Sequence, residues 1–194
     1  MLFGKRILLI IGGGISAYRS LELIRLLRKR GCSVSTCLTE GGSNFVTPLS
    51  VSALAGEEVH QDLFDLTDEA EMGHIELARA ADLVVVAPCT ADLMAKIANG
   101  FANDLASTLL LATDRPILLA PAMNVRMWNH PSTKRNYSTL MLDGAYFVGP
   151  NDGEMACGDF GPGRMSEPEQ IALEAEKILK SGPLKNTHVI VTSG

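Results

Sequence analysis

The sequence lacks the features that mark membrane, disulfide-rich and nucleic-acid-binding proteins. Its four cysteines form no CxxC pair and have no histidine at metal-ligand spacing, so neither a disulfide framework nor a metal site is expected. No uninterrupted apolar run approaches the ~18 residues of a membrane helix, and the run 7–11 is too short for a signal peptide. The 17 basic and 22 acidic residues give a formal charge of −5, which provides no basic surface for nucleic acid or an anionic membrane. We therefore expect a soluble cytoplasmic protein with no nucleic-acid or membrane partner.

The few cysteines are expected to be reduced, because cytosolic thiols normally remain so. Cys32, Cys37 and Cys89 then count as small buried apolar residues. Cys157 differs, since it lies in a glycine-rich segment rather than in an apolar run. A thiol in such a segment can be a proton donor, a nucleophile or a redox centre, or it can be incidental.

What the sequence does contain is an alternation of apolar runs and helical patterns over 194 residues, a length typical of one domain. The runs 7–11, 83–87 and 117–120 have no polar alternation, as in strands that are covered on both faces of a parallel sheet. Further strands are predicted at 34–38 and 146–148, and helices at 16–30, 47–54, 74–81, 90–98, 103–112, 131–142 and 167–180. This order predicts an α/β fold with a doubly wound, mainly parallel open sheet of the Rossmann or flavodoxin-like type. Its ligand should lie at the carboxyl ends of the strands, in the loops after residues 11, 38, 87 and 120.

The segment 149–166 interrupts this alternation, because it is dense in glycine and proline and too long for a simple connection. A loop of this kind is usually a lid, a binding loop or a linker, and we describe it as a flap. After the last predicted helix, residues 188–194 have the pattern of a strand and a turn with no helix to cover them. We therefore expect one domain over 1–182, followed over 183–194 by a linker and the first strand of a truncated second domain.

The turn Gly12-Gly13-Gly14 is the first candidate binding element, because it follows a buried strand and opens a helix. Backbone N–H groups and the helix dipole favour a phosphate there, and GGGISA fits the dinucleotide pattern G-x-G-x-x-A. A turn required only for packing would have the same sequence. An NAD site needs an acidic side chain at the end of the second strand, where Glu40 could serve, whereas Thr39 would suit a phosphate or a flavin.

Polar residues also follow the other buried strands. Thr90 and Asp92 stand at the start of a helix, where they are helix caps or ligand contacts. Asn124 offers a donor and an acceptor for a carboxylate or amide, or it is a turn residue. His74 suits acid–base chemistry near neutral pH, although a lone histidine is more often structural.

Seven segments, taken together, resemble the homo-oligomeric flavin-containing cysteine decarboxylases. They are GGISAY (13–18), TEGGSNFVTPL (39–49), MGHIELARAADLVVVAP (72–88), AKIANG (95–100), DLASTLLLA (104–112), PAMNVRMW (121–128) and ACGDFGPGRM (156–165). Within that family the chain is most similar to the phosphopantothenoylcysteine decarboxylases that are joined to a phosphopantothenate–cysteine ligase domain. The final HVIVTSG resembles the first strand and turn of that ligase domain.

The resemblance implies a carboxy-lyase of coenzyme A biosynthesis that converts 4′-phosphopantothenoylcysteine to 4′-phosphopantetheine, with FMN rather than NAD as cofactor. It implies catalytic roles for His74 in proton transfer, Asn124 in holding the substrate carboxylate, and Cys157 as a proton donor in the flap. The residues implied to contact FMN are Gly13, Gly14, Ile15, Thr39, Phe45, Thr90, Ala91, Asp92, Leu93 and Ala122. It also implies homo-oligomers, either trimers or trimers assembled into dodecamers, in which His74 reaches the site of a neighbouring subunit.

Two positions depart from the family pattern. Relatives commonly read Ser-Ala-Asn-Thr where this chain has residues 90–93, and the lysine that often follows the tyrosine is Arg19. Three other functions share part of the pattern: a decarboxylase of peptides that end in cysteine, a non-catalytic flavin-binding regulatory subunit, and a nicotinamide-dependent dehydrogenase. The flap sequence and the ligase-like end favour the coenzyme A enzyme over the first, and the presence of His74, Asn124 and Cys157 argues against the second.

Overall fold

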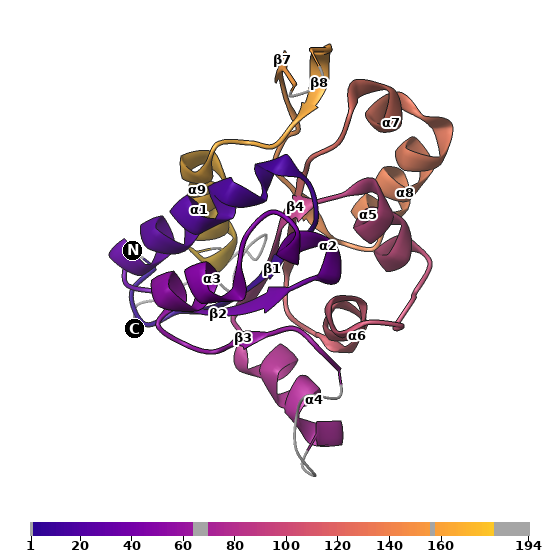
Figure 1. Ribbon diagram of the computed structural model, residues 1–194. Helices are drawn as coiled ribbons and strands as arrows, with labels where there is room; N and C mark the ends of the chain where they lie inside the picture. The colour runs from indigo at the N-terminus through magenta and orange to yellow at the C-terminus, as the bar shows by residue number, and fades with distance from the viewer. Residues whose placement is uncertain (1, 64–69, 156–157, 181–194) are drawn as a thin grey trace, which may run out of the picture.

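The computed structural model describes residues 2–63, 70–155 and 158–180 (Figure 1). Cys157 and the segment 181–194, for which the sequence predicts a linker and a strand, lie outside the described residues. His74 belongs to a described helix, but its side chain is outside the described part of the structure.

Within the described residues, six parallel strands form the central sheet, in the order β3-β2-β1-β4-β5-β6. Their bounds are β1 Arg6–Ile11, β2 Ser33–Leu38, β3 Val59–His60, β4 Leu83–Cys89, β5 Ile117–Pro121 and β6 Tyr146–Phe147. The chain adds β2 and β3 on one side of β1 and then returns to add β4 on the other, so the strand order reverses between β1 and β4. The doubly wound sheet predicted from the sequence is confirmed, and this reversal is the point where such sheets bind ligands.

Helices cover both faces of the sheet (Figure 1). One face carries α1 (Tyr18–Lys29), α3 (Pro48–Ala55) and α9 (Pro168–Lys180), and the other carries α4 (Ala70–Ala80), α5 (Ala91–Ala98), α6 (Leu105–Ala112) and α8 (Pro131–Leu142). Successive side chains of a strand point to opposite faces, so Ile7 and Leu9 pack under the first set of helices and Leu8 and Ile10 under the second. All four are essentially inaccessible to solvent, which explains why this strand shows no polar alternation.

Local sequence signals fix several helix ends. Thr47 caps α3 by accepting a hydrogen bond from the Ser50 N–H at 3.1 Å, Pro48 occupies the first turn, and Gly56 ends the helix with φ +74°. The helix predicted to begin at residue 16 begins differently, because Ile15–Ala17 form a 3₁₀ turn (η1) and α1 starts at Tyr18.

The flap segment contains an antiparallel hairpin that the sequence did not predict, formed by β7 (Asn151–Glu154) and β8 (Phe160–Arg164). Its strands are rich in glycine and proline, which usually mark loops. A Cβ atom added to Gly163, which has φ +151°, would lie 2.3 Å from the Met123 carbonyl oxygen. Glycine at that position therefore lets the hairpin pack directly on the loop after β5. Two short helices, α2 (Glu40–Ser43) and α7 (Val125–Asn129), were also not predicted.

Candidate active site at the carboxyl edge of the sheet

The loops after β1, β2, β4 and β5 meet at the carboxyl edge of the sheet, where the sequence placed the ligand site. Two cavities open there. The first, which we call the hairpin cavity, has a volume of about 450 Å³ and lies between the turn after β1, the loop after β5 and the β7-β8 hairpin. The second, the loop cavity, has a volume of about 620 Å³ and lies between the loops after β1 and β2 and the starts of α5 and α6. Both volumes are in the range of small-molecule sites.

The glycine turn after β1 separates the two cavities. A Cβ atom on Gly12 would lie 2.3 Å from the Pro88 carbonyl oxygen, and one on Gly13 would lie 3.1 Å from the backbone of Gly41. Close packing therefore explains these two glycines. Gly14 is different, because a Cβ atom there would meet nothing within 4 Å, while its φ of +110° favours glycine. The turn thus presents bare backbone to the hairpin cavity.

The two threonines expected to contact a flavin both cap helices and line the loop cavity. Thr39 Oγ1 donates to the Ile11 carbonyl at 3.0 Å and accepts from the Gly42 N–H at the same distance. Thr90 Oγ1 accepts from the Leu93 N–H at 3.2 Å. The expectation that Thr90 is a helix cap is confirmed, and its place in the cavity wall leaves a ligand contact as a prediction.

The loop cavity is acidic on balance. Lys96 Nζ donates to Asp104 at 2.7 Å and lies 3.5 Å from Asp92 Oδ2, so Asp92 is an ion-pair partner rather than a cap. Burial raises the pKa of the Asp104 carboxyl, but hydrogen bonds from Lys96 and Ser107 more than offset this, and the net pKa is lowered. Glu40 and Asp62 also line this cavity. One lysine therefore faces four carboxylates among its lining residues.

Asn124 lines the hairpin cavity with both ends of its amide fixed. Its Oδ1 accepts from the Arg126 N–H at 2.8 Å and caps α7, and its Nδ2 donates to Asp159 Oδ2 in the flap at 2.7 Å. The sequence predicted either a turn residue or a carboxylate-binding donor. The structure shows that Asn124 caps α7 and that its amide holds an internal carboxylate, so the binding of a substrate carboxylate stays a prediction.

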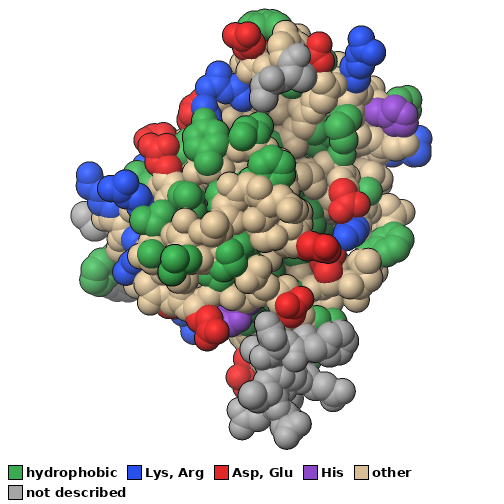
Figure 2. All heavy atoms as spheres, viewed as in Figure 1, with side chains coloured by type: hydrophobic (Ala, Val, Ile, Leu, Met, Phe, Trp, Pro, Cys, Tyr) green, Lys and Arg blue, Asp and Glu red, His purple; other side chains and the backbone are tan. Residues whose placement is uncertain are grey.

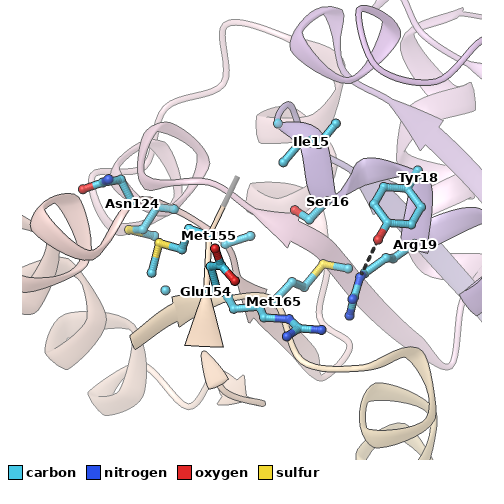
Figure 3. Close-up of a pocket in the computed structure, with 13 residues that line it drawn as sticks. Ile15, Ser16, Tyr18, Arg19, Asn124, Glu154, Met155 and Met165 are labelled. Carbon is cyan, nitrogen blue, oxygen red and sulfur yellow. Dashed lines mark hydrogen bonds between the residues drawn. The ribbon is translucent and has the colours of Figure 1, made fainter. Parts of the chain in front are cut away.

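Tyr18 and Arg19 lie at the end of the hairpin cavity opposite Asn124 (Figure 3), and Arg164 is another residue of the cavity wall. Glu167 accepts hydrogen bonds from Arg19 Nη1 through one oxygen and from Arg164 Nη2, at 2.9 Å, through the other. Arg19 Nε also donates to the Tyr18 hydroxyl at 3.2 Å. The hydrogen bond from Arg19 holds the pKa of the Glu167 carboxyl below its ordinary value. Hydrogen bonding to Glu167 likewise raises the pKa of Arg19.

Arg164, Glu167 and Asp159 were not singled out from the sequence. Arg164 and Asp159 are part of the motif ACGDFGPGRM, and Glu167 lies two residues after its end. Their partners lie far away along the chain, 35 residues for Asp159 with Asn124 and 148 for Glu167 with Arg19. The motif could have identified these residues as part of the site, but nothing in the sequence indicates the distant residues that they contact.

The remaining predicted site residues are dispersed. Ile15 and Ala122 line the hairpin cavity and Gly13 and Leu93 line the loop cavity, whereas Ala91 and Phe45 line neither. The structure thus brings most of the predicted cofactor contacts to two adjoining cavities rather than to one.

The three described cysteines are buried, as predicted. Burial raises the pKa of the Cys32 thiol to about 11 and that of Cys89 to about 12, and it raises the pKa of Cys37 as well. These thiols are therefore protonated at neutral pH. Within the described residues, no group of three or more histidine, cysteine or acidic side chains could hold a metal ion, and none of the helices is both long and apolar enough to cross a membrane.

An exposed group of hydrophobic side chains, which we call the apolar patch, adjoins the site. Its members come from η1, the start of α1, the segment after α2 and the start of α3: Ile15, Tyr18, Phe45 and Leu49, which are 60%, 54%, 47% and 79% exposed. Figure 2 shows hydrophobic side chains gathered over this part of the surface, with charged side chains mostly around its margin.

The strand order, with a site built from loops at the carboxyl edge, defines a doubly wound α/β protein of the flavodoxin-like class. The chain belongs to the Flavoprotein family, whose model matches residues 1–179.

Among curated proteins, the chain is 47% identical to the coenzyme A biosynthesis bifunctional protein CoaBC of Vibrio vulnificus (strain YJ016) over 193 residues, covering 100% of this chain. It spans 48% of that relative, so it corresponds to about half the length of the curated relatives that it matches. Among solved structures, it is similar to a mutant PPC decarboxylase complexed with pantothenoylaminoethenethiol, with 31% identity, a TM-score of 0.77, and coverage of 89% of this chain and 97% of that one. It is also similar to the FMN-dependent cysteine decarboxylase SpaF, with 28% identity, a TM-score of 0.79 and coverage of 92% and 97%.

Proposed function

We propose that this chain is an FMN-dependent decarboxylase that converts 4′-phosphopantothenoylcysteine to 4′-phosphopantetheine in coenzyme A biosynthesis. The observation that carries the proposal is the Asn124 amide, which lines a cavity at the ligand-binding edge and whose donor holds an internal carboxylate, that of Asp159. Similarity to CoaBC proteins over the whole chain and to a PPC decarboxylase structure supports the same activity. The proposal concerns decarboxylation only, because the chain corresponds to about half of those relatives.

FMN is the proposed cofactor, and the residues present fit it. At the carboxyl edge of the sheet, the glycine turn leaves the backbone at Gly14 open, which suits a phosphate. Two adjoining cavities of small-molecule size lie at the same edge. Membership of the Flavoprotein family and the similarity to SpaF support a flavin. The residues that would hold it are those expected from the sequence: Gly13, Gly14, Ile15, Thr39, Phe45, Thr90, Ala91, Asp92, Leu93 and Ala122.

The chemistry requires a redox cofactor, because a cysteine carboxylate has no electron sink for the electron pair that CO₂ leaves behind. Bound FMN supplies reversible two-electron oxidation at the sulfur-bearing carbon. Asn124, whose amide already holds the Asp159 carboxylate, is the proposed donor that orients the substrate carboxylate through a charge-assisted hydrogen bond. The hairpin lines the cavity, and its proposed role is to exclude water from the bound substrate, as lids do. His74 and Cys157 are the proposed proton-transfer groups.

Two further features belong to the proposal. The family resemblance implies a homo-oligomer, either a trimer or a dodecamer assembled from trimers, and the apolar patch is a surface suited to subunit contact. The cytoplasmic location expected from the sequence stays a prediction.

The test combines a spectrum with an assay. Purified protein should show flavin absorption with about one FMN per chain and release CO₂ from 4′-phosphopantothenoylcysteine. Asn124→Asp should keep its FMN but lose at least about 100-fold in kcat/KM, because the new carboxylate would repel both the substrate carboxylate and Asp159. A colourless protein that FMN does not reconstitute would refute the cofactor, and full activity of the variant would refute the role of Asn124.

The second candidate function is decarboxylation of a peptide that ends in cysteine, since the chain is similar to the cysteine decarboxylase SpaF as well. Faster CO₂ release from such a peptide than from 4′-phosphopantothenoylcysteine would favour this alternative.

A further inference from the structure

The two cavities of the site differ in charge, and this difference bears on where an anion can bind. The loop cavity is lined by four carboxylates and one lysine. The hairpin cavity is lined by Arg19 and Arg164 together with one carboxylate, Glu154. A dianionic phosphate is repelled by the first arrangement and attracted by the second.

The two arginines of the hairpin cavity form a preorganised pair. Both guanidinium groups hydrogen-bond the same Glu167 carboxylate, so they lie next to each other although they come from α1 and β8. Glu167 neutralises one of the two positive charges and leaves the other uncompensated within this cluster. The Arg19 side chain is only 17% exposed and is also held by the Tyr18 hydroxyl, so little conformational entropy remains to be lost when it binds a ligand.

The position of the pair relative to Asn124 matches the shape of the proposed substrate. In Figure 3, Asn124 lies at one end of the cavity and Tyr18 and Arg19 at the other, with Met155 and Met165 between them. The substrate likewise has a carboxylate at its cysteine end, a phosphate at its far end and an uncharged amide-linked chain between them. A molecule that places its carboxylate at Asn124 therefore extends its phosphate toward the arginine pair.

We propose that Arg19 and Arg164, held together by Glu167, form the subsite that binds the substrate's phosphate and thereby select a phosphorylated small molecule over a peptide that ends in cysteine. This inference rests on the proposed function. Guanidinium groups bind phosphate through paired, charge-assisted hydrogen bonds, which gives the subsite its chemical basis. Glu154 lines the same cavity and its negative charge opposes anion binding, so removal of that charge should strengthen phosphate binding.

The experiment compares 4′-phosphopantothenoylcysteine with pantothenoylcysteine, which lacks only the phosphate. In the FMN-loaded full chain, Arg19→Gln and Arg164→Gln should each lower kcat/KM for the phosphorylated substrate about 10- to 100-fold, mainly through KM. The same variants should change kcat/KM for the dephosphorylated substrate less than threefold. Arg19→Lys should retain most of the preference because it keeps the charge. Glu154→Gln should increase the preference for the phosphorylated substrate. Arg135→Gln, an exposed arginine on α8 outside the cavity, should match the wild type.

A binding measurement separates this inference from the proposed function. Calorimetry should show that 4′-phosphopantetheine binds the wild type more tightly than pantetheine does, and that Arg19→Gln removes the difference. Equal losses for both substrates and both products would overturn the subsite, even with a fully active wild type. If no CO₂ is released from either substrate, the proposed reaction fails, while the calorimetric comparison still decides the subsite.

The phosphate of FMN is the other source of the same chemistry. The FMN content of the purified variants distinguishes the two sources. Wild-type FMN content in Arg19→Gln and Arg164→Gln supports the substrate phosphate. Loss of FMN from these variants, with recovery in Arg19→Lys, would show that the arginines bind the cofactor and would overturn the inference.

Discussion

The three described thiols are buried, and the accessibility of each thiol can be measured. Cys32, Cys37 and Cys89 are buried, and burial raises their pKa values, so they are poor nucleophiles at neutral pH. Cys157, in the flap sequence, is the proposed proton donor. We expect a thiol reagent such as DTNB to modify one thiol per native chain at pH 8 and all four in guanidinium chloride.

The Cys157→Ser variant provides the control for this labelling. It should show no rapidly reacting thiol when native and three after unfolding. Rapid labelling of one native thiol in this variant would show that one of the buried cysteines is accessible after all.

The glycine turn is tightly packed at Gly12, where an added Cβ atom would meet the Pro88 carbonyl oxygen at 2.3 Å. Because that neighbour is backbone, Gly12→Ala should lower the free energy of unfolding by about 1–3 kcal/mol, measured by urea denaturation. Gly41→Ala is the matched control, since the nearest atom to its added Cβ is 3.5 Å away. Equal midpoints for the two variants would contradict the packing argument.

At the residue scale, the sequence predicts what depends on near neighbours. Thr90 is predicted as a helix cap because a cap and its helix lie within a few residues of each other. The partner of Asn124 could not be identified in this way, because Asp159 meets it only after the hairpin has folded back on the loop after β5. The sequence shows which functional groups a side chain carries, whereas its hydrogen-bond partner depends on how the chain folds.

At the scale of elements, the buried strands were predictable and the hairpin was not. β1, β4 and β5 are apolar on both faces, so their composition identifies them. β7 and β8 have the composition of a loop, and their pairing depends on backbone hydrogen bonds that glycine and proline do not signal. The segment 149–166 was correctly predicted to interrupt the alternation of strands and helices, but its hairpin was not predicted.

The hairpin is fastened to the body of the protein by identifiable hydrogen bonds. The Met123 N–H donates to the Gly163 carbonyl at 2.9 Å, and Asn124 Nδ2 donates to Asp159 Oδ2 at 2.7 Å. Asp159→Ala removes a charged acceptor while the Asn124 Oδ1 cap remains. We expect the free energy of local opening of residues 151–164 to fall by about 1.5–3 kcal/mol, seen as faster amide hydrogen exchange.

The control for this prediction lies within the same experiment. Exchange of the amides in β1 and β4 should stay unchanged, because those strands belong to the other sheet. Unchanged exchange of the hairpin would show that Asp159 does not hold it in place.

At the scale of the whole molecule, the strand order follows from the alternation of strands and helices, and the two-faced core follows from the apolar runs. The surface used for assembly cannot be predicted from the sequence in the same way, because exposed apolar side chains that are separated in sequence form a patch only in the folded chain. The apolar patch draws its members from α1, α3 and the segments that precede them.

If the apolar patch is a subunit contact, a charge within it should prevent assembly. We expect Leu49→Glu to lower the mass measured by light scattering from that of the homo-oligomer toward that of one chain, since Leu49 is 79% exposed in the isolated chain. Leu142→Glu is the control, because Leu142 is 89% exposed but lies at the end of α8, outside the patch. A wild type that is already monomeric, or equal masses for both variants, would contradict this prediction.

The separation of the two sheets affects how such a protein can diversify. In the described residues β7 and β8 pair with each other and with no strand of the six-stranded sheet. Insertions, deletions or exchange of the connecting turn therefore leave the register of every parallel strand unaltered. The sequence and length of the hairpin can therefore change while the six-stranded sheet stays the same. Such changes would alter which substrates the cavity accepts without altering the fold.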